Sequence, residues 1–128
     1  MAGFMRSYES QTYALMRIVA GFLFFWHGSQ KILGFPLPPP ELAQAPAFIV
    51  WTAGLIELLG GLFVMVGLFT RWAAFLSSGL MAAAYWTAHG FSALLPIQND
   101  GDLAVIYCFV FLYISARGGG MYSFDGGA

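Results

Sequence analysis

The chain has 128 residues, of which 59% are hydrophobic and 9% are charged, whereas an average soluble domain has about 25% charged residues, so we do not expect a water-soluble monomer. Its 5 Lys and Arg residues and 6 Asp and Glu residues give a net charge of −1, which leaves no basic face for nucleic acid. The single cysteine, Cys108, excludes an intramolecular disulfide, a CxxC redox pair and a thiolate zinc site.

Four apolar segments predict an all-α fold, an integral membrane four-helix bundle that forms one domain over residues 1–128. A helix needs roughly 20 apolar residues to cross a hydrocarbon core of about 30 Å. The first three segments reach this length, and the fourth is shorter but is bounded by Asp102 and by a glycine run after Arg117. The segments are residues 13–33, 47–69, 72–91 and 102–117.

The connections between these segments differ in character. Residues 34–41 are rich in proline and predict a rigid, extended loop. Thr70 and Arg71 predict a tight turn, and residues 91–101 predict a second loop. At the end of that loop, Asn99 and Asp100, together with Asp102 in the first helical turn, predict the N-terminal cap of the last helix.

The arginines predict the orientation of the bundle. Four spans place Arg6, Arg71 and Arg117 on one side, and only Lys31 on the other. Because Lys and Arg collect in cytoplasmic loops, we expect a multi-pass protein with both termini in the cytoplasm. Arg17 lies inside the first segment, and we expect its long side chain to extend to the lipid headgroups.

Glycines mark the helix faces that pack together. Helices in lipid associate through small residues, and the second segment carries such a seam. Glu57 lies in this seam, three residues after Gly54 and four before Gly61, so its side chain should face protein. Gly28 belongs to a similar stripe in the first segment.

Glu57 is the centre of the candidate site. A carboxylate at mid-helix costs about 2.5 to 3.5 kcal/mol on insertion scales, so it should be protonated or matched by a partner. His27 lies at a matching depth, and Lys31 could reach down to Glu57. Two interpretations are open: an interhelical polar lock, or a proton-handling or ligand-headgroup site that opens to the outer face.

The candidate residues form two groups. No catalytic residue is assigned and no metal site is expected. The ligand-binding or proton-handling candidates are His27, Lys31, Glu57, Tyr85, His89 and Tyr107. The residues assigned to topology or packing are Arg17, Gly28, Gly61, Arg71 and Asp102.

Six short motifs, together with an arginine early in the first segment, resemble the DoxX family of small four-helix bacterial membrane proteins from about Arg17 to Asp125. Each motif alone is weak, and together they are specific. Asp102 stands where family members usually have Glu, and the tail lacks the usual Gly-Pro-Gly-Arg pattern. The motifs are WHGSQK (26–31), GLIELLGG (54–61), GLFTR (67–71), AHG (88–90), NDGDL (99–103) and YSFD (122–125).

The resemblance implies a protein of the bacterial inner membrane. Its function is implied by family members that are linked to redox chemistry. The resemblance implies a membrane subunit of a quinone-linked or oxidative-stress system, with membrane lipid and a redox enzyme as partners. The alternative is a non-catalytic membrane anchor or assembly factor for a partner enzyme, which the short loops favour. Whether the chain is itself an enzyme stays open, as does homo-oligomerisation.

No cofactor is certain from the sequence. A quinone would need hydrogen-bond donors at its carbonyls and a path for protons, and His27, Lys31, Glu57, Tyr85 and His89 are suitable types. A haem held by His27 and His89 is disfavoured, because their depths differ by about 6 Å at roughly 1.5 Å per residue.

Overall fold

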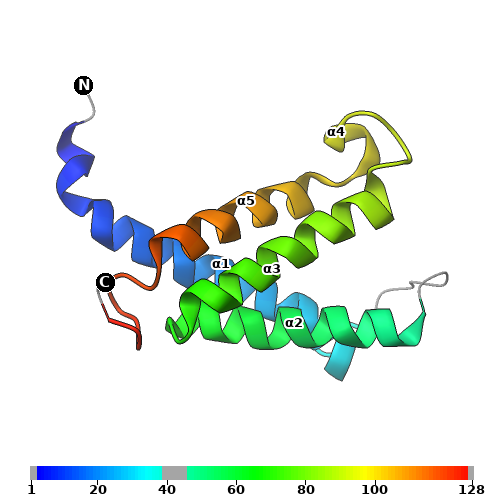
Figure 1. The fold of residues 1–128 in the computed structure, drawn as a ribbon, viewed down its shortest axis with the longest axis horizontal. Coiled ribbons are helices and arrows are strands. Elements are labelled where there is room, and N and C mark those ends of the chain that lie inside the picture. The colour runs from blue at the N-terminus through cyan, green and yellow to red at the C-terminus, as the bar shows by residue number, and fades with distance from the viewer. Residues whose placement is uncertain (1–2, 39–45, 127–128) are drawn as a thin grey trace.

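The computed structural model describes residues 3–38 and 46–126, and within them the fold is all-α, without a strand, as the sequence predicts (Figure 1). The proline-rich loop predicted at residues 34–41 lies partly outside the described residues. The elements are η1 (Gly3–Tyr8), α1 (Glu9–Leu33), α2 (Ala47–Val66), α3 (Thr70–Ala84), the π-helical turn η2 (Tyr85–His89), α4 (Pro96–Asn99) and α5 (Asp102–Arg117).

The long helices differ from the predicted segments mainly at their ends. Helix α1 begins at Glu9, four residues before the first apolar segment. Helix α2 ends at Val66, because Gly67 turns the chain with a φ of 74°. Helix α3 already begins at Thr70, which the sequence placed in a turn, and after Ala84 the chain widens into the π-helical turn η2.

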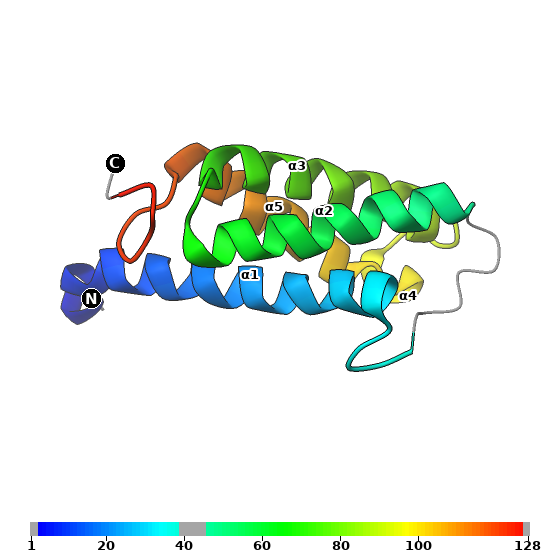
Figure 2. The same ribbon diagram turned by 90° about the horizontal axis from the view of Figure 1, so that it is seen from below.

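The four long helices form two pairs, α1 with α2 and α3 with α5 (Figure 2). The short turn between α2 and α3 joins the pairs at the end of the bundle that also holds both termini, which we call the tail end. Figure 1 shows the pairs diverging toward the opposite end. Phe24 of α1 and Phe111 of α5 close the core between the pairs, fully buried with ring centroids 4.7 Å apart.

Helices α1 and α2 touch through their backbones. A Cβ atom added at Gly21 would lie 2.6 Å from the backbone nitrogen of Met65, and one at Gly61 would lie 2.6 Å from that of Phe25. Gly28 meets the α2 backbone in the same way. Close approach of this kind is how small residues bring helices together.

Arg17 lies in the interior of the tail end, so the expectation that it extends to the headgroups is wrong. Its guanidinium is fully buried and donates to the carbonyls of Val64 (2.7 Å), Met65 (2.8 Å), Met121 (3.0 Å) and Tyr122 (2.8 Å). Val64 and Met65 lie in the last turn of α2, where carbonyls lack helical partners and attract cations. These carbonyls replace water around the charge.

Two further side chains bind the tail end together. The Asp125 carboxylate accepts hydrogen bonds from the backbone N–H of Phe69 (3.0 Å) and from the N–H (2.8 Å) and hydroxyl (2.6 Å) of Thr70, at the start of α3. Arg71 donates to carbonyls at the end of α5, among them that of Ser115 (3.1 Å). The C-terminal tail is therefore part of the fold.

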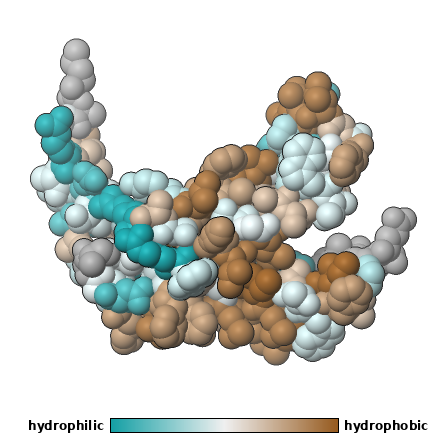
Figure 3. Space-filling model, viewed as in Figure 1, coloured by the Kyte–Doolittle hydropathy of each residue, from teal (hydrophilic) through white to brown (hydrophobic). Residues whose placement is uncertain are grey.

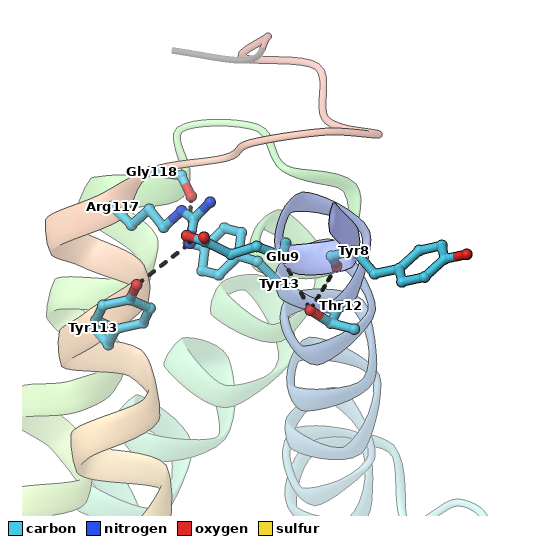
Figure 4. A network of polar contacts seen from close by, with 7 residues as sticks. All are labelled: Tyr8, Glu9, Thr12, Tyr13, Tyr113, Arg117 and Gly118. Carbon is cyan, nitrogen blue, oxygen red and sulfur yellow. Dashed lines mark hydrogen bonds and ion pairs between the residues drawn. The ribbon is translucent and has the colours of Figure 1, made fainter. Parts of the chain in front are cut away.

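Figure 4 shows how the N-terminal part of α1 is held against the end of α5. The Tyr13 hydroxyl donates to the carbonyl of Gly118 at 2.5 Å. The Arg117 guanidinium lies 4.3 Å from the centroid of the Tyr13 ring and 3.3 Å from a carboxylate oxygen of Glu9. Arg117, in the last turn of α5, thus binds the N-terminal part of α1.

Much of the described surface is apolar (Figure 3). Large hydrophobic side chains are exposed along all four long helices, for example Trp72 at 73% and Phe109 at 63%. Within residues 3–38 and 46–126, one helix, α2, is both long and apolar enough to cross a membrane, with a mean hydropathy of 2.1.

Candidate functional site

A cleft opens between the two helix pairs at the end opposite to the tail end. It has a volume of about 200 Å³, and Figure 3 shows the hollow between the two arms of the molecule. All four long helices contribute to its walls. Its apolar residues include Phe24, Met81 and Leu103, and its polar residues are His27, Glu57, His89, Asp100 and Tyr107.

Glu57 is the most deeply buried acid of this cleft, and its partner is Lys31. The Lys31 Nζ donates to Glu57 Oε2 at 2.6 Å, with side-chain exposures of 16% for Lys31 and 5% for Glu57. The close approach of α1 and α2 places the two side chains together. The sequence left His27 and Lys31 as possible partners of Glu57, and the structure shows the ion pair with Lys31.

His27 and Tyr107 stand next to each other on the walls formed by α1 and α5. Their ring centroids are 6.0 Å apart, with the rings nearly perpendicular, and Tyr107 stacks on Phe111 at 5.6 Å. Both residues also line a second cavity, of about 360 Å³, between α1, the residues that follow it and α5. They therefore separate two neighbouring spaces.

His89 belongs to η2 and its ring is held by the loop before α5. Its Nδ1 lies 2.8 Å from the backbone carbonyl oxygen of Asn99. A carbonyl can only accept, so Nδ1 carries the proton and Nε2 of the neutral ring is an acceptor. The arrangement fixes one tautomer of His89.

Asn99 was assigned to the cap of the last helix, and this assignment is wrong. Gly101 is the N-cap of α5 and no side chain caps it, although Asp102 does lie in the first turn. The buried Asn99 amide instead donates to the Tyr85 hydroxyl (3.0 Å) and accepts from the N–H of Gly101 (2.9 Å). It shapes the loop that presents its own carbonyl to His89.

The other predicted residues lie around the cleft or away from it. Tyr85 faces an apolar crevice between α3 and α5, and Asn99 links it to His89. Gly28 and Gly61 lie where α1 meets α2, whereas Arg17 and Arg71 lie at the tail end. The sequence singled out no role for Asn99 at the site, since its contacts depend on the loop.

The cleft combines acid–base groups with an apolar lining. Imidazole, carboxylate, phenol and ammonium groups can each exchange protons or hydrogen bonds with a bound molecule. Within the described residues, no three His, Cys, Asp or Glu side chains lie close enough to hold a metal ion. The size and lining of the cleft suit a small, largely apolar molecule that carries polar groups.

The geometry defines a small all-helical protein with a polar cleft between two helix pairs. The family model of DoxX matches residues 12–90, and the chain belongs to the DoxX family.

Two relatives are similar over different lengths. An uncharacterized protein of Haemophilus influenzae is 37% identical over 127 residues, which cover 94% of this chain and 93% of that protein. The "Putative oxidoreductase CatD" of Bacillus subtilis is 35% identical over 68 residues, which cover 52% of this chain and 50% of that protein. No solved structure matches the chain.

Proposed function

We propose that the chain is a multi-pass protein of the bacterial cytoplasmic membrane, with both termini in the cytoplasm. The exposed apolar side chains of all four long helices support this, because such a surface is unfavourable in water. Arg71 and Arg117 lie together at the tail end, as the orientation requires.

The test has two parts. Membranes are washed with alkaline carbonate, and a reporter that distinguishes a cytoplasmic from an external location is fused to the C-terminus. We expect the chain to stay in the membrane and the reporter to show a cytoplasmic location. Release by carbonate, or an external C-terminus, would overturn this part of the proposal.

We further propose that the cleft binds a quinone or a related lipophilic aromatic molecule and that the chain works as the membrane subunit of a redox system. The observation that carries this is the grouping of His27, Glu57 and His89 around one cavity with apolar walls. The apolar side chains of the lining, such as Met81 and Leu103, would hold the aromatic part, while the polar groups would bind its oxygen atoms. The printed name of the Bacillus subtilis relative supports a redox connection.

The binding test uses naphthoquinone and its two-electron-reduced form, naphthohydroquinone, added to purified protein in detergent, with tryptophan fluorescence as the readout. Ala84 lines the cleft, so Ala84→Phe should fill it and weaken binding at least tenfold. Ala83 is its exposed neighbour on α3, and Ala83→Phe is the matched control. Failure of both forms to bind, or equal weakening by the two variants, would refute the proposal.

A second candidate, a non-catalytic anchor or assembly factor, is favoured by the Lys31–Glu57 ion pair, because it joins α1 to α2 as a structural lock would. The partner enzyme would be isolated by co-purification with the tagged chain. Replacing Glu57 by Gln then separates the two functions. An anchor would keep the partner and its turnover, whereas a redox subunit would keep the partner but lose turnover with quinone.

A further inference from the structure

Some polar groups of the cleft can only donate or only accept hydrogen bonds. All groups of this kind in the lining are acceptors. Glu57 contributes a carboxylate whose Oε2 is occupied by Lys31, and within the described residues no hydrogen bond reaches Oε1. Asp100, an exposed residue of the lining, carries a second carboxylate. His89 contributes Nε2, because its Nδ1 proton is engaged by the Asn99 carbonyl.

The fixed tautomer of His89 is well supported by the surrounding loop. The carbonyl that binds it belongs to Asn99, whose side chain makes three hydrogen bonds of its own, to Tyr85, Ala93 and Gly101. Reversing the tautomer would place a lone pair of Nδ1 against that carbonyl oxygen and lose the hydrogen bond. His89 therefore presents an acceptor to the cleft whenever its ring is neutral.

The remaining polar groups do not reverse the excess of hydrogen-bond acceptors in the cleft. The Tyr107 hydroxyl can donate or accept, and His27 can do either according to its tautomer. The Lys31 ammonium donates to Glu57 at 2.6 Å, and Lys31 is not among the residues that line the cleft. A ligand with hydroxyl groups can satisfy the acceptors, whereas a ligand with only carbonyl oxygens leaves them unpaired.

We propose that the cleft is selective for the hydroxyl-bearing, reduced form of its aromatic ligand, an aromatic diol, over the corresponding quinone. This inference rests on the proposed aromatic-binding function and adds the oxidation state to it. A site that has to hydrogen-bond a hydroxyl group strongly rejects an analogue that lacks it, because its own polar groups then stay unsatisfied. Glu57 and His89 are the specificity-determining residues.

The test compares three ligands on the unmodified protein under anaerobic conditions: naphthohydroquinone, its dimethyl ether and naphthoquinone. We expect naphthohydroquinone to bind at least tenfold more tightly than either of the others. A tenfold preference for the reduced form also raises the midpoint potential of the bound two-electron couple by about 30 mV, which redox titration measures independently.

Two variants test whether the preference for the diol depends on the tautomer of His89. His89→Gln places an amide in the cleft that can rotate to donate, so the preference for the diol should fall severalfold. Thr87 is exposed on the same π-helical turn and does not line the cleft, so Thr87→Val should keep the preference. An unchanged preference in His89→Gln would overturn the assignment to His89.

The outcomes separate this inference from the proposed function. Equal binding of diol and quinone, or tighter binding of quinone, would overturn the selectivity and leave the aromatic site standing. Equal binding of the diol and its dimethyl ether would also overturn it, since the ether has the same rings but no hydroxyl proton. Absence of binding by all three would refute the site itself.

Discussion

Arg17 and Asp125 bind opposite sides of the same turn. Arg17 donates to carbonyls at the end of α2, and Asp125 accepts from N–H groups at the start of α3. Each charge thus lies at the helix end whose dipole favours it. The connection between the two helix pairs is therefore held by a residue from α1 and a residue from the C-terminal tail.

Replacing Arg17 should be the most damaging single change at the tail end. Arg17→Leu would leave four carbonyls without their charged donor, and we expect a loss of about 3 kcal/mol or more in the free energy of unfolding. Arg17→Lys should recover only part, because one ammonium cannot reach all four. Thermal unfolding in detergent measures this, with the exposed Arg6→Gln as control. Equal stability of Arg17→Leu and Arg6→Gln would contradict the prediction.

Attachment of the C-terminal tail should depend on pH through Asp125. Partial burial raises the pKa of this carboxyl, but hydrogen bonds from Thr70 and Phe69 outweigh it and hold the pKa below its ordinary value of 3.8. The stabilisation is therefore fully present above pH 3.8 and is lost as the pH falls through the lower folded value.

Hydrogen exchange of the Phe124 and Asp125 amides, which bind the carbonyls of Val66 and Gly67, reports the attachment. We expect their protection to fall on acidification below pH 3.8. In Asp125→Asn, protection should be weaker at every pH and should not respond to this acidification. An equal acid response in both proteins would assign the effect to another group.

The Lys31–Glu57 pair should show strong thermodynamic coupling. Lys31→Met or Glu57→Gln alone leaves one polar partner unmatched in a buried position, and each should cost about 3 kcal/mol. The double variant should cost less than the sum, because neither charge remains. A double-mutant cycle of unfolding free energies measures the coupling, and additive losses would show that the two side chains act independently.

The contact between α1 and α2 should not accommodate a methyl group added at one of its glycines. Gly61→Ala would place its Cβ 2.6 Å from a backbone nitrogen, so we expect a loss of about 1 to 3 kcal/mol. Gly28→Ala should behave in the same way. Gly79 in α3 has nothing within 4 Å of an added Cβ, and Gly79→Ala should be neutral or stabilising by up to about 1 kcal/mol. Similar stabilities for Gly61→Ala and Gly79→Ala would contradict this account.

The sequence predicted the features that depend on local patterns. Apolar runs and the bounding Asp102 and Arg117 gave the helix of residues 102–117, and helical spacing placed Glu57 beside glycines on one face. Depth along the helix favoured His27 as the partner of Glu57, and the reach of its side chain brought in Lys31, with which the ion pair is made. These inferences need only the geometry of a single helix or of two neighbouring ones.

Long-range contacts could not be predicted in this way. Arg17 was expected at the headgroups because nothing local indicates that Met121 and Tyr122 fold back over it. The start of α3 depends on Asp125, which is 55 residues further along the chain. Asn99 resembled a helix cap, and its contact with Tyr85 depends on the course of the loop between them.

The glycine contact between α1 and α2 has a consequence for how a ligand arrives. With their backbones touching at Gly21 and Gly61, these helices leave no passage between them. The side between α1 and α5 is different, because Leu23 and Leu103 border the second cavity there and are themselves about half exposed. In a bilayer we expect entry from the hydrocarbon phase through this side. Occupancy would then follow how strongly a molecule partitions into lipid, more than its concentration in water.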